Sequence, residues 1–142
     1  MRLLILMVTF VSFMALSVSL QVRAEMVVVV AKSSSIAELT EREIKRIFLA
    51  KTRRLRDGRR IQPVELSDSS YKEQFYRKIT GKNLRQLNSY WTTLIFTGKG
   101  KPPRKMDKTE ALLSEVATNP SAIAYLPEEY LDGRFKVIHI VR

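Results

Sequence analysis

The chain has 142 residues, 25 Lys plus Arg against 14 Asp plus Glu, a formal net charge of +11 and no Cys. This length suits one domain around a single core, and the lack of Cys excludes disulfides and thiol chemistry. The basic charge favours anionic partners, namely small oxyanions, acidic glycans or lipids, or an acidic protein.

Residues 1–24 are expected to be a signal peptide. A basic start leads into an apolar run, Leu3–Leu20, and Val22-Arg23-Ala24 places small or modest side chains at the −3 and −1 positions. The sequence therefore predicts cleavage after Ala24, a domain over residues 25–142 and a periplasmic location. An uncleaved membrane anchor is the alternative, since the run is about long enough to span a thinned bilayer. A secreted basic domain is not expected to meet nucleic acid.

The first predicted elements are a strand and a helix. Met26–Ala31 is a continuous apolar, β-branched run, typical of a strand buried on both faces. A capping box at Thr40–Glu43 then begins a helix that ends near Ala50. Its expected core face is Ile44, Ile47 and Phe48.

A basic loop follows, Lys51–Arg60, with a tight turn at Asp57-Gly58. Its candidate anion or partner patch is Arg53, Arg54, Arg56, Arg59 and Arg60. The functional interpretation is attraction of phosphate groups or anionic lipid head groups. The alternative is a solvated loop that protects a nearby sheet edge from aggregation. No aromatic residues are interleaved, so base stacking is not indicated.

The next unit runs from strand to helix. Ile61–Leu66 is short and β-branched, and apolar side chains from Tyr71 to Ile79 have helical spacing. Between them lie Ser67, Asp68, Ser69 and Ser70, of which the last three are candidate helix caps. Free amides, a positive helix end and hydroxyls form an anion-binding geometry, whereas plain capping is the alternative interpretation.

The candidate ligand-binding residues come from two strand ends. Four belong to the unit just described: Ser67, Ser69, Ser70 and Tyr71. We expect Ser33, Ser34 and Ser35, which follow the first strand, to complete the site from the adjacent strand end. Open α/β sheets place ligands at such ends.

The second half of the chain continues the alternation. Gly81 is a good C-cap, and the next helix, Asn83–Phe96, has an expected apolar face of Leu84, Leu87, Trp91, Leu94 and Ile95. Trp91 is expected to anchor the core, with ligand stacking as the alternative. Thr97–Asp107 is rich in Gly, Pro and Lys, which predicts an irregular loop, either a lip over a site or a linker.

The remaining elements complete the predicted fold. They are a helix from Thr109 to Thr118 with a capping box-like start at Asp107, a strand at Ala122–Leu126, a helical turn at Pro127–Leu131 and a strand at Phe135–Val141. Strands alternating with helices predict a three-layer α/β/α sandwich with a mixed, mostly parallel sheet.

Two motifs resemble a known family. Ile47–Lys51 looks like I-F-x-G-K, and Asn119–Tyr125 looks like N-x-x-A-I-G-Y, of the type 2 periplasmic solute-binding proteins, specifically the phosphate-binding subunits of phosphate ABC transporters. The resemblance covers about Met26 to Ile138. It implies one lobe of that fold, phosphate or another small oxyanion as ligand, and a membrane transporter or a sensor protein as partner.

The sequence departs from the family where the anion is bound. The family motif R-x-D-G-S-G-T corresponds to Glu65–Tyr71, which keeps the serine at Ser69 but has Glu65 in place of the arginine. A carboxylate there would repel an oxyanion. An Arg of the 51–60 loop could neutralise it. The family also clamps its ligand between two lobes, so a homodimer could supply the second lobe here.

The second hypothesis is a non-transporting interaction module. Such a protein would keep the fold and use its basic loop to dock an acidic partner or a membrane surface. Catalysis finds little support, because the single His, His139, lies in an apolar terminal strand and no nucleophile motif is present. The sequence predicts no enzyme, no cofactor and no metal site.

Overall fold

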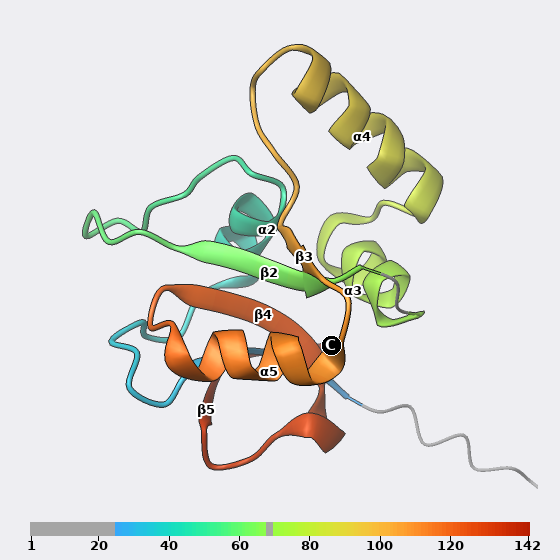
Figure 1. Ribbon diagram of the computed structural model, residues 1–142. Helices are drawn as coiled ribbons and strands as arrows, with labels where there is room; N and C mark the ends of the chain where they lie inside the picture. The colour runs from blue at the N-terminus through green and yellow to red at the C-terminus, as the bar shows by residue number, and fades with distance from the viewer. Residues whose placement is uncertain (1–24, 68–69) are drawn as a thin grey trace, which may run out of the picture.

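The computed structural model describes residues 25–67 and 70–142, which form a five-stranded sheet in the order β3-β2-β4-β1-β5 (Figure 1). The strands are β1 (Met26–Ala31), β2 (Gln62–Leu66), β3 (Arg104–Met106), β4 (Ala122–Pro127) and β5 (Phe135–Val141). β2 is parallel to β3 and β4, and β1 is antiparallel to β4 and β5. The predicted α/β class is confirmed. Two of the described strand pairs are parallel and two are antiparallel. The direction of each strand depends on how the intervening segment crosses the sheet, which the local residue pattern does not encode.

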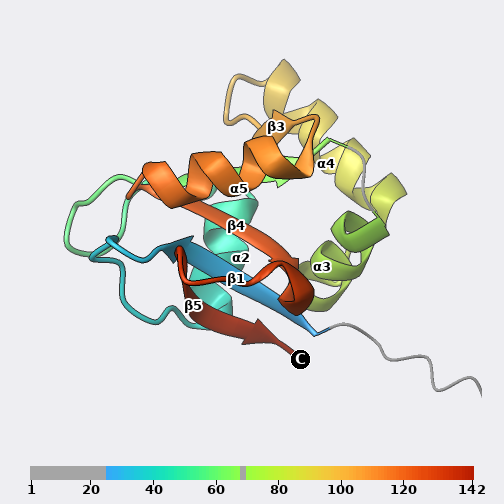
Figure 2. The ribbon, with the colours of Figure 1, turned by 60° about the horizontal axis from the view of Figure 1, so that its bottom comes forward.

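Helices cover both faces of the sheet (Figure 2). They are α2 (Glu41–Phe48), α3 (Ser70–Thr80), α4 (Leu84–Phe96) and α5 (Thr109–Thr118), with a 3-10 turn at Glu128–Tyr130. Val27 and Val29 of β1 pack in the cluster that contains α5, whereas Val28 and Val30 pack in the cluster that contains α2, α3 and α4. The two-sided burial predicted for this strand is therefore confirmed. No helix in the described ranges is both long and apolar enough to cross a bilayer.

Local signals placed several boundaries correctly. The Thr40 side chain caps α2, and the Glu43 carboxylate accepts a hydrogen bond from the Thr40 backbone N–H at 2.9 Å. Gly58 and Gly81 have φ values of 84° and 75°, the left-handed region that their turn and cap positions need. Of the candidate caps of α3, Ser70 is the first residue of the helix, whereas Asp68 and Ser69 lie outside the described residues, as does the predicted signal peptide.

Two expectations about residues 83–107 need correction. The segment after α4 contains β3, which pairs with β2 from Val64↔Arg104 to Leu66↔Met106, so it is not wholly irregular. Along α4, only Leu87 and Trp91 are buried, whereas Ile95 and Phe96 are 57 % and 92 % exposed. α4 lies farther from the sheet than the other helices (Figure 1), which leaves the end of its apolar stripe uncovered.

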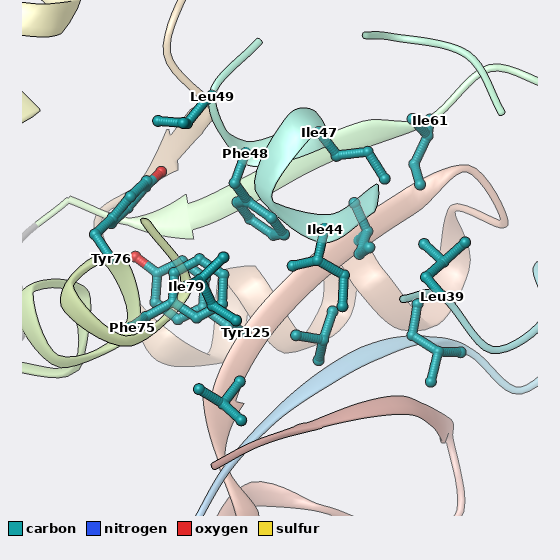
Figure 3. Packing of buried hydrophobic residues seen from close by; sticks show 14 of the residues in the cluster. Leu39, Ile44, Ile47, Phe48, Leu49, Ile61, Phe75, Tyr76, Ile79 and Tyr125 are labelled. Atoms are coloured by element: carbon teal, nitrogen blue, oxygen red, sulfur yellow. The ribbon is translucent and has the colours of Figure 1, made fainter. Parts of the chain in front are cut away.

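The core between α2, α3 and the sheet is built on four aromatic rings (Figure 3). Phe75 of α3 stacks on Tyr125 of β4 with ring centroids 3.9 Å apart, and it meets Phe48 edge-on at 4.9 Å. Tyr76 lies edge-on to Phe75 at 5.3 Å. Trp91 joins the same cluster, as predicted for a core anchor. The rings hold α3, and thus the end of β2, in a defined position.

Candidate functional site

The predicted strand-to-helix site lies at the carboxyl end of β2. Ser67 follows β2 directly, and Ser70 is the first residue of α3; Asp68 and Ser69 lie outside the described residues. The Ser67 amide donates to the Met106 carbonyl at 2.9 Å, and its hydroxyl donates to the Asp107 carboxylate at 2.8 Å. The Ser67 hydroxyl is thus already used by an acidic residue at the end of β3.

The rest of this edge is open to solvent. Ser70 is exposed, and the half-buried Tyr71 donates its hydroxyl to Glu129 at 3.4 Å. A hollow bordered by Leu66, Tyr71 and Tyr130 has a volume of only about 10 Å³. An anion bound here would therefore rest on the surface of this lobe, against the start of α3.

The serines after β1 are not brought to this edge. β1 is antiparallel to β4, and β2 is parallel to β4. The carboxyl ends of β1 and β2 therefore lie on opposite sides of the sheet, measured along the strand direction. Ser34 is buried and donates to the Pro120 carbonyl at 2.7 Å, next to the start of β4. Ser35 accepts a hydrogen bond from the Arg59 guanidinium. The expectation that Ser33, Ser34 and Ser35 complete the β2 site is therefore wrong.

Glu65, which occupies the resembled family's arginine position, is fully buried, and both of its carboxylate oxygens accept hydrogen bonds. Its Oε1 accepts from Lys72 Nζ at 2.7 Å, and its Oε2 accepts from the hydroxyls of Tyr76 and Tyr125 at 2.9 and 3.2 Å. The sequence left open neutralisation by an arginine of the 51–60 loop; the cation in contact is Lys72, in the first turn of α3. We call these four residues the Glu65 cluster.

The Glu65 cluster predicts a loss of stability at alkaline pH. Burial, followed by the charge of Glu65, raises the pKa of Tyr76 and of Tyr125 well above the usual value of 10.0. Above about pH 10 the unfolded chain therefore binds fewer protons than the folded chain, and stability falls as pH rises. We expect the urea midpoint to be level from about pH 7 to 9 and to drop by pH 11.

A double variant isolates this contribution. Tyr76→Phe/Tyr125→Phe should start from a lower stability at pH 7 and then lose less between about pH 10 and 11 than the unsubstituted protein does. Equal alkaline losses in both proteins would show that other groups, such as the lysines, cause the effect.

The predicted basic patch divides into paired and unpaired cations. Arg59 pairs with Asp57, and Arg56 lies 3.4 Å from Glu43. Arg53 and Arg54 donate to backbone carbonyls, at 2.6 Å to that of Lys101 and at 2.8 Å to that of Gly58. Arg60 makes no ion pair within the described part of the chain.

The structure adds a groove that the sequence did not reveal. It has a volume of about 960 Å³ and runs along β2 between the 51–60 loop and the segment that leads into β3. Its cations are Arg53, Arg54, Arg60, Lys101 and Arg104, and no acidic residue lines it. Sequence reasoning did not include Lys101 and Arg104 in the basic patch, because they lie some forty residues after the 51–60 loop. The signal that could have found them is the presence of Lys- and Arg-rich segments both before β2 and before β3. We call this feature the basic groove.

Among the described residues, no group of three His, Cys, Asp or Glu side chains is placed to hold a metal ion. His139 lies half-buried on β5, an edge strand.

Three solved structures share the fold. The ABC-type phosphate transport receptor from Vibrio cholerae aligns with a TM-score of 0.62 at 15 % identity, over 81 % of this chain and 45 % of that one. A putative phosphate ABC transporter substrate-binding protein with bound phosphate, from Clostridium perfringens, aligns with a TM-score of 0.60 at 20 % identity, over 80 % of this chain and 44 % of that one. PstS from Borrelia burgdorferi aligns with a TM-score of 0.53 at 12 % identity, over 80 % of this chain and 46 % of that one.

These TM-scores show a common fold, in which this chain matches one lobe of a phosphate receptor. The chain spans less than half the length of each of these proteins. A scan against models of protein families finds no match. A search of curated proteins also finds none.

Proposed function

We propose that this chain is an exported, periplasmic, non-enzymatic solute-binding-like protein that binds phosphate or a similar small oxyanion at the start of α3, in connection with phosphate transport. The observation that carries the proposal is that Ser67 follows β2 and that α3 begins at Ser70, within a fold shared with phosphate receptors. Helix amides and the positive helix end favour an anion at such a place.

The site residues would act as hydrogen-bond donors. The hydroxyls of Ser67, Ser69, Ser70 and Tyr71 would donate to the anion. Glu65 does not oppose this arrangement as strongly as its sequence position suggests, because it is buried against Lys72 and two tyrosine hydroxyls. A transporter or a second copy of the chain would cover the exposed side of the anion.

Calorimetric titration of the purified protein with phosphate, sulfate and arsenate tests the proposal. We expect one site, and Ser67→Ala should weaken phosphate binding roughly tenfold, since a hydrogen bond to a charged group contributes about 1.5–3 kcal/mol. Ser33→Ala, at the opposite edge of the sheet, is the matched control and should bind normally. The absence of heat at millimolar anion would contradict the proposal.

Asp107 gives a prediction in the opposite direction. Its carboxylate accepts the hydrogen bond that the Ser67 hydroxyl would give to the anion, and its charge repels an oxyanion. Asp107→Asn should therefore strengthen phosphate binding several-fold, on the order of 1 kcal/mol. Glu38→Gln, which removes an exposed acid elsewhere, should leave the affinity unchanged. Weaker phosphate binding by Asp107→Asn would mean that Asp107 supports the site.

A second candidate function is a docking module that uses the basic loop. The specific observation in its favour is the basic groove, where five cations gather without an acidic neighbour in the lining. Replacing Arg53, Arg54 and Arg56 by Ser should then abolish capture of a partner and leave anion binding at α3 nearly intact. Of these three, Arg56 lies outside the groove lining.

A further inference from the structure

The basic groove carries positive charge that the fold does not compensate. Arg104 is paired with Glu115 at 2.5 Å, but Arg53 and Arg54 donate only to neutral carbonyls. Arg60 and Lys101 have no ion pair in the described ranges. The pKa of Arg53 is lowered from its usual value because surrounding atoms desolvate the guanidinium. Neighbouring cations without counter-charges favour an anionic occupant.

The shape of the groove argues for an extended occupant. Its base is Ile61 and the first half of β2, Gln62–Val64, where the strand has no neighbour on one side because β3 pairs with β2 only from Val64 onward. At about 960 Å³ it is far larger than a phosphate ion needs. It is also concave, whereas a flat bilayer surface would meet projecting cations. A peptide segment lying along β2 would fill it.

The chemistry of the lining fits carboxylates. Four of the five cations are arginines. The planar guanidinium binds a carboxylate in a two-pronged manner, as it does a phosphate group, so the extended shape of the groove, and not the choice of arginine, favours a run of carboxylates. An Arg-rich, acid-free surface is therefore complementary to a run of Glu and Asp side chains.

Exposed apolar side chains lie a few residues before the groove-lining segment 100–104. The segment after α4 supplies Gly100, Lys101 and Pro102 to the lining, and α4 itself ends in the exposed Ile95 and Phe96. A Cβ at Gly100 would lie 3.1 Å from Leu94 Cδ2 and 3.2 Å from the Ala50 Cβ, so this lining residue is close both to the last turn of α4 and to the residue that precedes the basic loop. Exposed aromatic residues beside arginines are typical of protein–protein interfaces.

We propose that the basic groove binds an extended, Glu- and Asp-rich segment of a partner protein, and that Ile95 and Phe96 receive an apolar side chain of that segment. This inference rests on the second candidate function and names its partner chemistry. The site is separate from the proposed oxyanion site, which lies at the carboxyl end of β2.

Fluorescence polarisation with a short labelled peptide, rich in Glu and with one Leu, tests the proposal. The triple variant Arg54→Ser/Arg60→Ser/Lys101→Ser should lower affinity at least about tenfold, because buried charge pairs across an interface are individually strong. The control Lys78→Ser/Arg85→Ser/Arg142→Ser removes the same charge from exposed positions outside the groove and should lower affinity less than about twofold. Phe96→Ser should weaken binding only when the peptide contains Leu.

The outcomes separate this proposal from its alternatives. Equal losses in both triple variants would show that net charge alone attracts the peptide, and would overturn it. Binding to phosphatidylglycerol-containing vesicles but not to the peptide would overturn it in favour of a membrane surface. Displacement of the peptide by millimolar phosphate would indicate a small-anion site. Normal phosphate titration of the groove variant, with the peptide lost, would support the groove and leave the oxyanion proposal standing.

Discussion

Replacing Lys72 by Met should lower the free energy of unfolding by about 3 kcal/mol. The substitution leaves the fully buried Glu65 carboxylate without the ammonium group that lies 2.7 Å from it. Breaking a buried ion pair typically costs about 3–5 kcal/mol, because the remaining charge is uncompensated. We expect the lower end of this range, since two tyrosine hydroxyls still donate to Glu65. Urea unfolding at neutral pH measures the effect.

Two further variants make this result specific. Glu65→Gln added to Lys72→Met should restore much of the lost stability, because the unpaired charge is removed. Lys78→Met, on an exposed position of the same helix, should change stability by less than about 0.5 kcal/mol. If Lys72→Met were no more harmful than Lys78→Met, the Glu65 cluster would not be an important source of stability.

Replacing Phe75 by Ala should cost about 3–5 kcal/mol of unfolding free energy. Phe75 is fully buried, stacks on Tyr125 and meets Phe48 and Tyr76 edge-on. The substitution loses buried apolar area and leaves a cavity that these rings cannot easily close. Thermal or urea unfolding followed by circular dichroism would report it.

Phe96→Ala is the matched control. It makes the same chemical change at a side chain that is 92 % exposed, so it should alter stability by less than about 0.5 kcal/mol. A large loss in Phe96→Ala would mean that this side chain is covered in solution, for example by a second copy of the chain. A small loss in Phe75→Ala would contradict the packing of α3 described here.

The proposed oxyanion site and the basic groove lie in different parts of the domain. The first uses the carboxyl end of β2 and the fold shared with phosphate receptors, whereas the second uses the first half of β2. Asp107 and Glu129 lie beside Ser67 and Tyr71, so acidic groups are close to the oxyanion site, whereas none lines the groove. Ser67→Ala and the triple variant Arg54→Ser/Arg60→Ser/Lys101→Ser therefore test the two proposals independently.

Sequence reasoning succeeded where one short segment holds all the determinants of its structure. Thr40 and Glu43 are three residues apart, so their capping box can be read directly from the sequence, and the β-branched run at residues 26–31 carries its own strand signal. It failed at β3, Arg104–Met106, where the residues have little strand preference and only the backbone of β2 makes them a strand.

The candidate site shows the same division. Composition and pattern were sufficient to predict the α/β class, the basic loop and a hydroxyl-rich helix start, because periodicity and capping act over a few neighbouring residues. Only the tertiary structure decided that Ser34 lies at the opposite edge from Ser67, that Lys72 and Tyr125 surround Glu65, and that Lys101 joins the arginines in a groove. Those relations depend on strand direction and on contacts between distant segments, which local patterns do not encode.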